Sequence, residues 1–282
     1  MTLPSDLVSR IARLDPMPVS AQALMKALHD DSMGPARLAP FIEHDPAMAA
    51  EVLRRANSVA FGGCRPTANV HAAVLRLGTS NILTIVLGGS LQQLKVKLPM
   101  YGLGEDELWL HSVAASLAVR AIQQERPSAN IPDSASIAAL LHDIGKLVMA
   151  RYMKADAATI RACARERTIT FVEAERETFG CDHTEVGAAL ARHWNLPDAL
   201  VSAIECHHDT TLTDPTPTMD AVMVANMVAK SVNAGLGAEG MNLAPDHLAL
   251  KRLGLDFVAY CRVILQTHDW VVDLKSSYGA AA

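Results

Sequence analysis

The stretch LLHDIGK, residues 140–146, places a His–Asp pair inside an apolar run and is the starting point for both the fold and the site. An imidazole beside a carboxylate, here His142 and Asp143, suits a divalent metal that activates water, and Lys146 suits a phosphate oxygen. On one continuous helix Lys146 shares their face, and Gly145 leaves room for a ligand or a neighbouring helix. Taken alone, the heptapeptide favours an ion-paired, half-buried helix end. His followed by Asp also occurs at 29–30, 44–45, 208–209 and 268–269, so the rest of the chain must separate this pair from four others.

The composition predicts an all-α fold. The chain has 282 residues, enough for one large or two modest domains, and 50% of them are hydrophobic but only 4% aromatic. Apolar residues recur at helical spacing from end to end, and no alternating strand or internal repeat is found. The stretch KVKLPMYGLGEDE (95–107) contains proline and glycines and is interpreted as a linker, which gives subdomains 1–98 and 105–282. Residues 133–151 are predicted to form one helix.

Charge and hydropathy argue against two classes of partner. The net charge is −5 and no dense basic run occurs, so DNA binding is not indicated. The longest apolar stretch, ILTIVLGGSL (82–91), is too short and too glycine-broken to span a bilayer, and no secretory signal is recognised. We therefore expect a cytoplasmic protein with reduced cysteines. Cys181 and Cys206 lie beside histidines of interest and are candidates for a supporting or redox-sensitive role.

Several histidines stand where a helical bundle could bring them together. His111 lies within an apolar helix, and His183 stands in the first turn of a helix that Asp182 and Glu185 are predicted to cap. The pair His207–His208 ends the helix that begins near Pro197. Helical bundles build metal sites from ligands on several helices, as these would be. The remaining histidines fall on polar faces or at helix ends and are expected to have no role in the site: His29, His44, His71, His193, His247 and His268.

The series looks like the HD superfamily of metal-dependent phosphohydrolases, and the whole chain resembles the HDOD family, the HD-related output domain of bacterial signalling proteins. The resemblance covers roughly residues 3–235 and rests on LDPMPVSAQALMKAL, IEHDPAMAAEVLRRANSVAFG, VHAAVLRLG, LWLHSVAASLAVRAI, AALLHDIGKLVM, HTEVGAALARHWNLPDALVSAIECHH and VMVANMVAKSV. It implies an N-terminal helical subdomain packed on an HD-like bundle. It also implies a regulatory role through contact with signalling proteins, usually without catalysis.

The metal positions are similar to those of the HD-GYP branch, the cyclic di-GMP phosphodiesterases. By this resemblance the metal ligands are His111, His142, Asp143, His183, His207 and His208, while Asp143 and Lys146 are the catalytic residues. One or two divalent ions, iron or manganese, are implied. The chain departs from that branch twice: HHDTTLTDPTPT (207–218) lacks the GYP signature, and Asn226 replaces the late Asp. A neutral ligand weakens a dication site.

The sequence therefore predicts a signal-transduction protein that binds a divalent transition metal and is non-catalytic or weakly catalytic. The alternative is an active phosphohydrolase acting on a cyclic dinucleotide or another nucleotide. A homodimer is compatible with an Ala- and Leu-rich helical regulator.

Overall fold

The described residues fold into helices only, apart from one isolated antiparallel bridge between Leu98 and Leu103. The prediction of an all-α fold is confirmed. The structure is a computed structural model that describes residues 3, 5–11, 38–43, 46–58, 61, 66–92, 97–153, 157–239 and 246–279. The chain forms two compact units, one of Met1–Asp15 together with Leu94–Ala282 and one of Pro16–Gln93.

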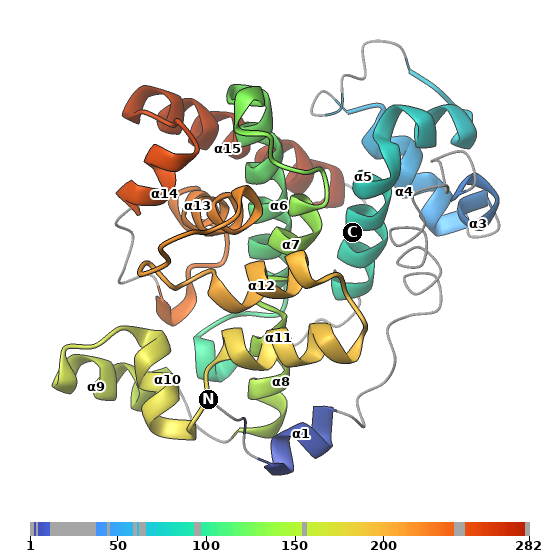
Figure 1. The fold of residues 1–282 in the computed structure, drawn as a ribbon. Coiled ribbons are helices and arrows are strands. Elements are labelled where there is room, and N and C mark those ends of the chain that lie inside the picture. Colours follow the sequence, from blue (N-terminus) through green and yellow to red (C-terminus); the bar gives the residue numbers. More distant parts are fainter. Residues whose placement is uncertain are drawn as a thin grey trace. The chain divides into compact units, whose positions relative to one another are not determined.

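The smaller unit contains three described helices that contact one another: α3 (Ala39–Glu43), α4 (Pro46–Ala56) and α5 (Val70–Gln92). Pro46 takes the first position of α4, where a missing N–H costs nothing. The stretch VHAAVLRLG (70–78), whose amphipathic pattern and final glycine predict a short helix, is helical up to Gly78, whose φ of 75° lies in the left-handed region. Beyond this kink the chain resumes a helix to Gln92, which is why α5 is drawn as one element (Figure 1). The helix predicted near residues 20–31 lies outside the described residues.

Helix α5 is the one described helix long and apolar enough to cross a membrane, over Val70–Gly88. Length and composition alone do not separate a spanning helix from the core helix of a soluble protein. Ile82 and Leu83 of this helix are fully buried, as in a core helix. The expectation that the protein has no membrane partner stays a prediction.

The larger unit is built around α6 (Glu107–Glu125), which packs against α7, α13 and α15 (Figure 1). One face of α6 presents fully buried Ala114, Ala118 and Ala121, small side chains that let neighbouring helices approach closely. The other helices of this unit are α1 (Ser5–Ile11), α7 (Ala135–Leu141), α8 (Ile144–Tyr152), α9 (Ala157–Arg167), α10 (Phe171–Phe179), α11 (His183–His193), α12 (Asp198–Cys206), α13 (Pro217–Ser231), α14 (His247–Arg252) and α15 (Phe257–Gly279).

Helix α1 belongs to the larger unit, although the sequence analysis assigned residues 1–98 to the N-terminal subdomain. It contacts α11, and its apolar residues Leu7 and Ile11 are buried. A seven-residue helix is too short to be stable alone, so its apolar face has to be covered by a partner helix.

The predicted single helix over 133–151 is wrong: the chain forms α7 and α8 with a break at His142–Asp143. Asp143 has φ −98° and ψ 10°, outside helical geometry, and its carboxylate does not cap α8. The break lets α7 pack on α6 while α8 packs on α11. Gly145 permits this second contact, because a Cβ at that position would lie 1.9 Å from the carbonyl oxygen of His183.

The segment interpreted as a loose linker, residues 95–107, is a compact turn over its described part. Leu98 and Leu103 exchange backbone hydrogen bonds of 2.9 and 3.2 Å around the 3-10 turn η3 (Pro99–Tyr101). Pro99 and Gly102 shape this turn, the glycine in the left-handed region at φ 63°, and do not loosen the chain. As a result Tyr101 is carried into the core, where it is fully buried.

Candidate metal centre

The five predicted histidine ligands converge on the sixth predicted ligand, Asp143, which is buried at the α7–α8 junction. His111 lies in the second turn of α6, His183 is the first residue of α11, and His207 and His208 directly follow α12. The capping box predicted at the start of α11 is present, since the Asp182 side chain accepts hydrogen bonds from the backbone N–H groups of Thr184 and Glu185. Local sequence signals thus fix where His183 starts its helix, and packing brings it to Asp143.

The two carboxylate oxygens of Asp143 face two different groups of ligands. Oδ2 lies 3.5 Å from His111 Nε2 and 3.4 Å from His142 Nε2. His111 Nε2 is in turn 3.2 Å from His142 Nε2 and 3.1 Å from Asn226 Oδ1. We call the group of His111, His142, Asn226 and Asp143 Oδ2 the asparagine pole.

The second group lies on the other side of the carboxylate. Asp143 Oδ1 is 3.4 Å from His183 Nε2 and 3.5 Å from His207 Nε2. His208 completes it, since one ligand atom from each of these four residues lies within 4.8 Å of the others. We call the group of His183, His207, His208 and Asp143 Oδ1 the histidine pole.

Three imidazoles are held in a defined orientation by backbone carbonyls. A carbonyl oxygen only accepts hydrogen bonds, so each Nδ1 atom carries a hydrogen, and an Nε2 atom that carries none directs its lone pair at the centre. The pairs are His111 with Ala234 O at 2.8 Å, His142 with Ala139 O at 2.7 Å and His207 with Ile204 O at 2.6 Å.

The donor set fits a divalent transition metal. Asp143 Oδ1, His183 Nε2 and His207 Nε2 are buried and form no hydrogen bond within the described part of the chain. Buried polar atoms without partners are costly, and a cation would satisfy all three at once. Imidazole nitrogen with one carboxylate is a donor set that suits zinc, iron, nickel or copper, and manganese when oxygen ligands contribute.

His183 is anchored by a buried carboxylate that the sequence analysis did not identify. Glu175, from α10, is fully buried and accepts from His183 Nδ1 at 2.7 Å. Its other oxygen accepts from the Tyr101 hydroxyl at 2.6 Å. A carboxylate behind a ligating histidine fixes the ring and strengthens its donor atom.

Burial and charge prepare the side chains differently for binding. Burial lowers the pKa of His111 to about 3 and that of His207 to about 4, so both are neutral ligands at pH 7. Burial also lowers the pKa of His183, but the negative charge of Glu175 outweighs it and raises that pKa to about 10. Burial would raise the pKa of Asp143, but the neighbouring His142 and the ammonium of Lys146, 2.7 Å away, outweigh it and hold that pKa well below its usual value. Asp143 is therefore an anionic ligand.

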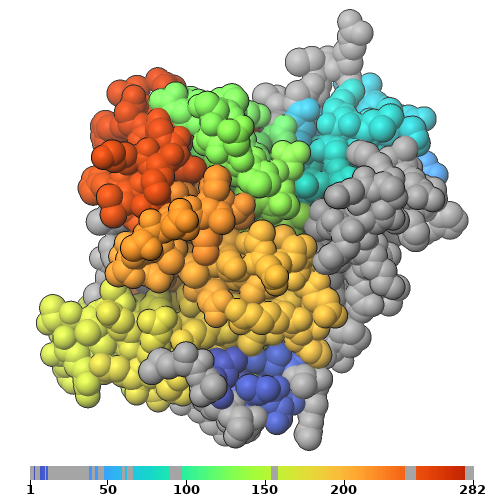
Figure 2. Space-filling model, viewed as in Figure 1, coloured from blue at the N-terminus to red at the C-terminus, as the bar shows by residue number. Residues whose placement is uncertain are grey.

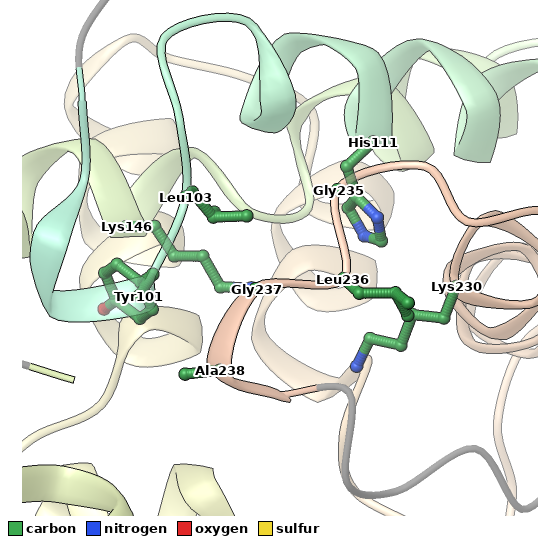
Figure 3. Close-up of a pocket in the computed structure, with 9 residues that line it drawn as sticks. All are labelled: Tyr101, Leu103, His111, Lys146, Lys230, Gly235, Leu236, Gly237 and Ala238. Atoms are coloured by element: carbon green, nitrogen blue, oxygen red, sulfur yellow. The ribbon is translucent and has the colours of Figure 1, made fainter. Parts of the chain in front are cut away.

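Two buried lysines stand beside the asparagine pole. The ammonium of Lys146, from α8, lies 2.7 Å from Asp143 Oδ2, and Lys230 comes from α13, one helical turn after Asn226. Figure 3 shows both reaching from opposite sides toward the loop of Gly235–Ala238, with His111 above it. The two lysines, His111 and this loop line one small cavity, whose wall also includes Tyr101.

A larger cleft reaches the site from the surface. Its floor includes His207, His208, Asn226 and Lys230, and its walls come from α10, α11 and α14. The segment Asp209–Thr211, which stands where the GYP signature would follow, forms part of the wall. Figure 2 shows, in yellow and orange, the segments that border this cleft.

Where they are described, the histidines predicted to have no role belong to neither pole, although His247 lines the cleft that reaches His207 and His208. His71, His193, His247 and His268 are exposed, and His29 and His44 lie outside the described residues. Cys181 is buried and Cys206 half-buried, the latter in the wall of the cleft, but neither belongs to either pole.

Three residues of the site had not been found from the sequence: Glu175, Tyr101 and Lys230. Glu175 lies eight residues before His183 on a different helix, and no spacing rule links them. Tyr101 falls in the segment interpreted as a linker. Lys230 had a usable signal, because it stands four residues after Asn226 and therefore on the same face of its helix.

Comparison with known proteins bears on the family and the fold of the chain. Residues 14–210 match the family described as HDOD domain. An uncharacterized protein of Treponema pallidum (strain Nichols) is 25% identical over 237 residues, which are 81% of this chain and 44% of that protein. The chain thus spans less than half the length of that relative.

Solved structures show the same fold at low identity. An HDOD domain protein with unknown function from Geobacter sulfurreducens superposes with a TM-score of 0.73 at 23% identity, covering 94% of this chain and 96% of its own. A "Putative signal transduction protein" from Marinobacter aquaeolei VT8 gives 0.68 at 20%, covering 98% and 63%. A "Putative metal-dependent phosphohydrolase" from Shewanella amazonensis SB2B gives 0.59 at 20%, covering 93% and 95%.

Proposed function

The chain belongs to the HDOD domain family, and from that premise we propose that it is a signal-transduction protein whose helical bundle binds a divalent transition metal, iron or manganese. One observation carries the proposal: the two oxygens of Asp143 are divided between two groups of inward-facing imidazoles. Within the described residues, Asp143 Oδ1 and two imidazole nitrogens of the histidine pole have no hydrogen-bond partner. A purely structural cluster would have no use for such unsatisfied atoms.

In this proposal, the chain hydrolyses phosphodiesters weakly or not at all. When bound, a divalent cation lowers the pKa of a water and polarises a phosphoryl oxygen. Asn226 supplies no negative charge at the position where the HD fold usually has an aspartate, and Lys146 already pairs with Asp143 Oδ2. Both features reduce the attraction of the asparagine pole for a cation.

The second candidate is an active phosphohydrolase on a cyclic dinucleotide or another nucleotide. The cleft favours this candidate, because His207, His208 and Asn226 line it and a substrate could enter there from solvent. Lys146 would offset the charge that develops on the phosphoryl oxygens, and Asp143 would hold the cation. The name of the Shewanella neighbour points in the same direction, although its identity to this chain is only 20%.

The other properties of the proposal follow from the family and the charge. Output passes through contact with other signalling proteins in the cytoplasm, with neither DNA nor a membrane as partner, and a homodimer is the proposed assembly. The net charge of −5 supports the exclusion of DNA.

Metal analysis of the purified full chain tests the first part. We expect iron or manganese in the wild type and a strong loss in His142→Ala, with His193→Ala, an exposed histidine, as the matched control. A wild type without transition metal, before and after incubation with ferrous iron or manganese, contradicts the proposal.

Turnover of cyclic di-GMP with manganese or ferrous iron under reducing conditions separates the two candidates. The regulatory proposal expects a rate close to that of metal-free protein. A rate far above that level, abolished by Asp143→Ala, establishes the phosphohydrolase in its place.

A further inference from the structure

The two poles of the centre differ in charge although both present converging ligands. Each shares the single carboxylate of Asp143, and each adds three further side chains. We infer that the two poles differ in their affinity for a divalent ion. One ion is held tightly at the histidine pole, and the asparagine pole binds a second ion much more weakly. This inference rests on the proposed metal-binding function and says where and how the metal is held.

The asparagine pole is electrostatically unfavourable for a dication. Its share of the carboxylate, Asp143 Oδ2, already lies 2.7 Å from the ammonium of Lys146. Its other oxygen ligand, Asn226 Oδ1, is neutral. Lys230 places a second buried positive charge in the wall of the same cavity as His111 (Figure 3). A cation bound there would be repelled by the ammonium of Lys146 at Asp143 Oδ2 and by that of Lys230 in the cavity wall, and it would gain no negative charge from Asn226.

The histidine pole has the opposite balance. Asp143 Oδ1 forms no hydrogen bond within the described residues, so it is available to a cation. A second negative charge stands directly behind this pole, because His183 Nδ1 donates to Glu175 at 2.7 Å. Tyr101 donates to the same carboxylate at 2.6 Å and keeps it in place. Such a carboxylate makes its histidine a better ligand, and its loss costs about 10- to 100-fold in metal affinity in comparable sites.

Single substitutions separate the poles. Asn226→Asp adds a negative charge to the asparagine pole and leaves the other pole untouched. His208→Ala removes a ligand from the histidine pole, and because His208 is only partly buried this variant is expected to fold. Glu175→Gln weakens the same pole from behind. His193→Ala, exposed at the end of α11, is the control.

The experiment is a titration of the chelator-treated full chain with Mn²⁺. Binding is measured by calorimetry and by the electron paramagnetic resonance signal of free Mn²⁺, and circular dichroism verifies that each variant is folded. For the wild type and for His193→Ala we expect one tight ion and a second bound at least about tenfold more weakly. Asn226→Asp strengthens the second step by about tenfold or more and changes the first by less than about threefold. His208→Ala and Glu175→Gln weaken the first step and leave the second.

Two results overturn the inference while the proposed function stands. The first is a wild type that binds two Mn²⁺ ions with equal affinity. The second is a tight Mn²⁺-binding step that survives in His208→Ala and is lost in His111→Ala. If Asn226→Asp fails to fold, the comparison of His208→Ala with His111→Ala still decides. A wild type that binds no Mn²⁺ overturns the proposed function itself, and the inference with it.

Discussion

Replacing Gly145 with alanine tests whether the contact between α8 and α11 builds the centre. The added Cβ would lie 1.9 Å from the carbonyl oxygen of His183 and 2.6 Å from the backbone nitrogen of Gly187. Ordinary contact begins at 3.4 Å, so the two helices must separate by the difference of 3.4 and 1.9 Å, about 1.5 Å. Both obstructing atoms belong to the backbone and cannot rotate away.

The expected cost follows from two opposing terms. Inserting a methyl group into a packed contact costs roughly 1–3 kcal/mol, and the rigid backbone here places the cost at the upper end. Alanine recovers about 1 kcal/mol over glycine in a helix. We expect a net loss of about 2 kcal/mol in the free energy of unfolding, which for a unit of this size lowers Tm by about 4–8 °C.

Urea unfolding and thermal unfolding measure the effect, with Gly104→Ala as control, because a Cβ there meets only Glu107 Oε2 at 3.4 Å. The control should change stability by less than about 0.5 kcal/mol. The shift in Gly145→Ala also moves His183 relative to Asp143, so Mn²⁺ affinity should fall. Equal stability and equal Mn²⁺ affinity in the two variants would refute the reasoning.

Two further predictions concern the polar groups around His183. Tyr101→Phe removes the hydroxyl that donates to a Glu175 oxygen at 2.6 Å. We therefore expect a loss of about 1–3 kcal/mol in the free energy of unfolding and weaker Mn²⁺ binding. Unchanged Mn²⁺ binding would contradict a supporting role of Tyr101 in the metal centre. Asp182→Ala removes the cap of α11 and should cost about 0.5–2 kcal/mol at pH 7. Burial raises the pKa of Asp182, but the charge of His183 and three hydrogen bonds from Thr184 and Glu185 outweigh it and hold the pKa below its usual value. The stabilisation is therefore complete above the unfolded pKa of about 4 and is lost as the pH falls through the folded pKa. Urea unfolding should show the gap between wild type and variant closing below about pH 4, and a gap independent of pH would refute this.

Local signals predicted individual helices well. The apolar run with a single histidine became α6, and the Asp182–Glu185 pattern marks the start of α11. They failed at residues 133–151 and 95–107. Near Asp143 no proline interrupts the helical pattern and Gly145 lies within α8, so the break is explained by the packing of α7 and α8 against different helices. At Pro99 and Gly102 the same residues that suggest a flexible linker form a closed turn that buries Tyr101.

The sequence by itself determined the helical class, the family resemblance and the side chains able to hold a metal, because these depend on residue type, spacing and capping along the chain. Only the tertiary structure decided how those side chains divide around Asp143, since the distances join α6, the α7–α8 junction, α11 and α12. It also supplied Glu175 and Tyr101, which no local pattern connects to the ligands. The physical reason is that charge balance depends on distance in space: LLHDIGK contains both Asp143 and the Lys146 ammonium that neutralises one of its oxygens.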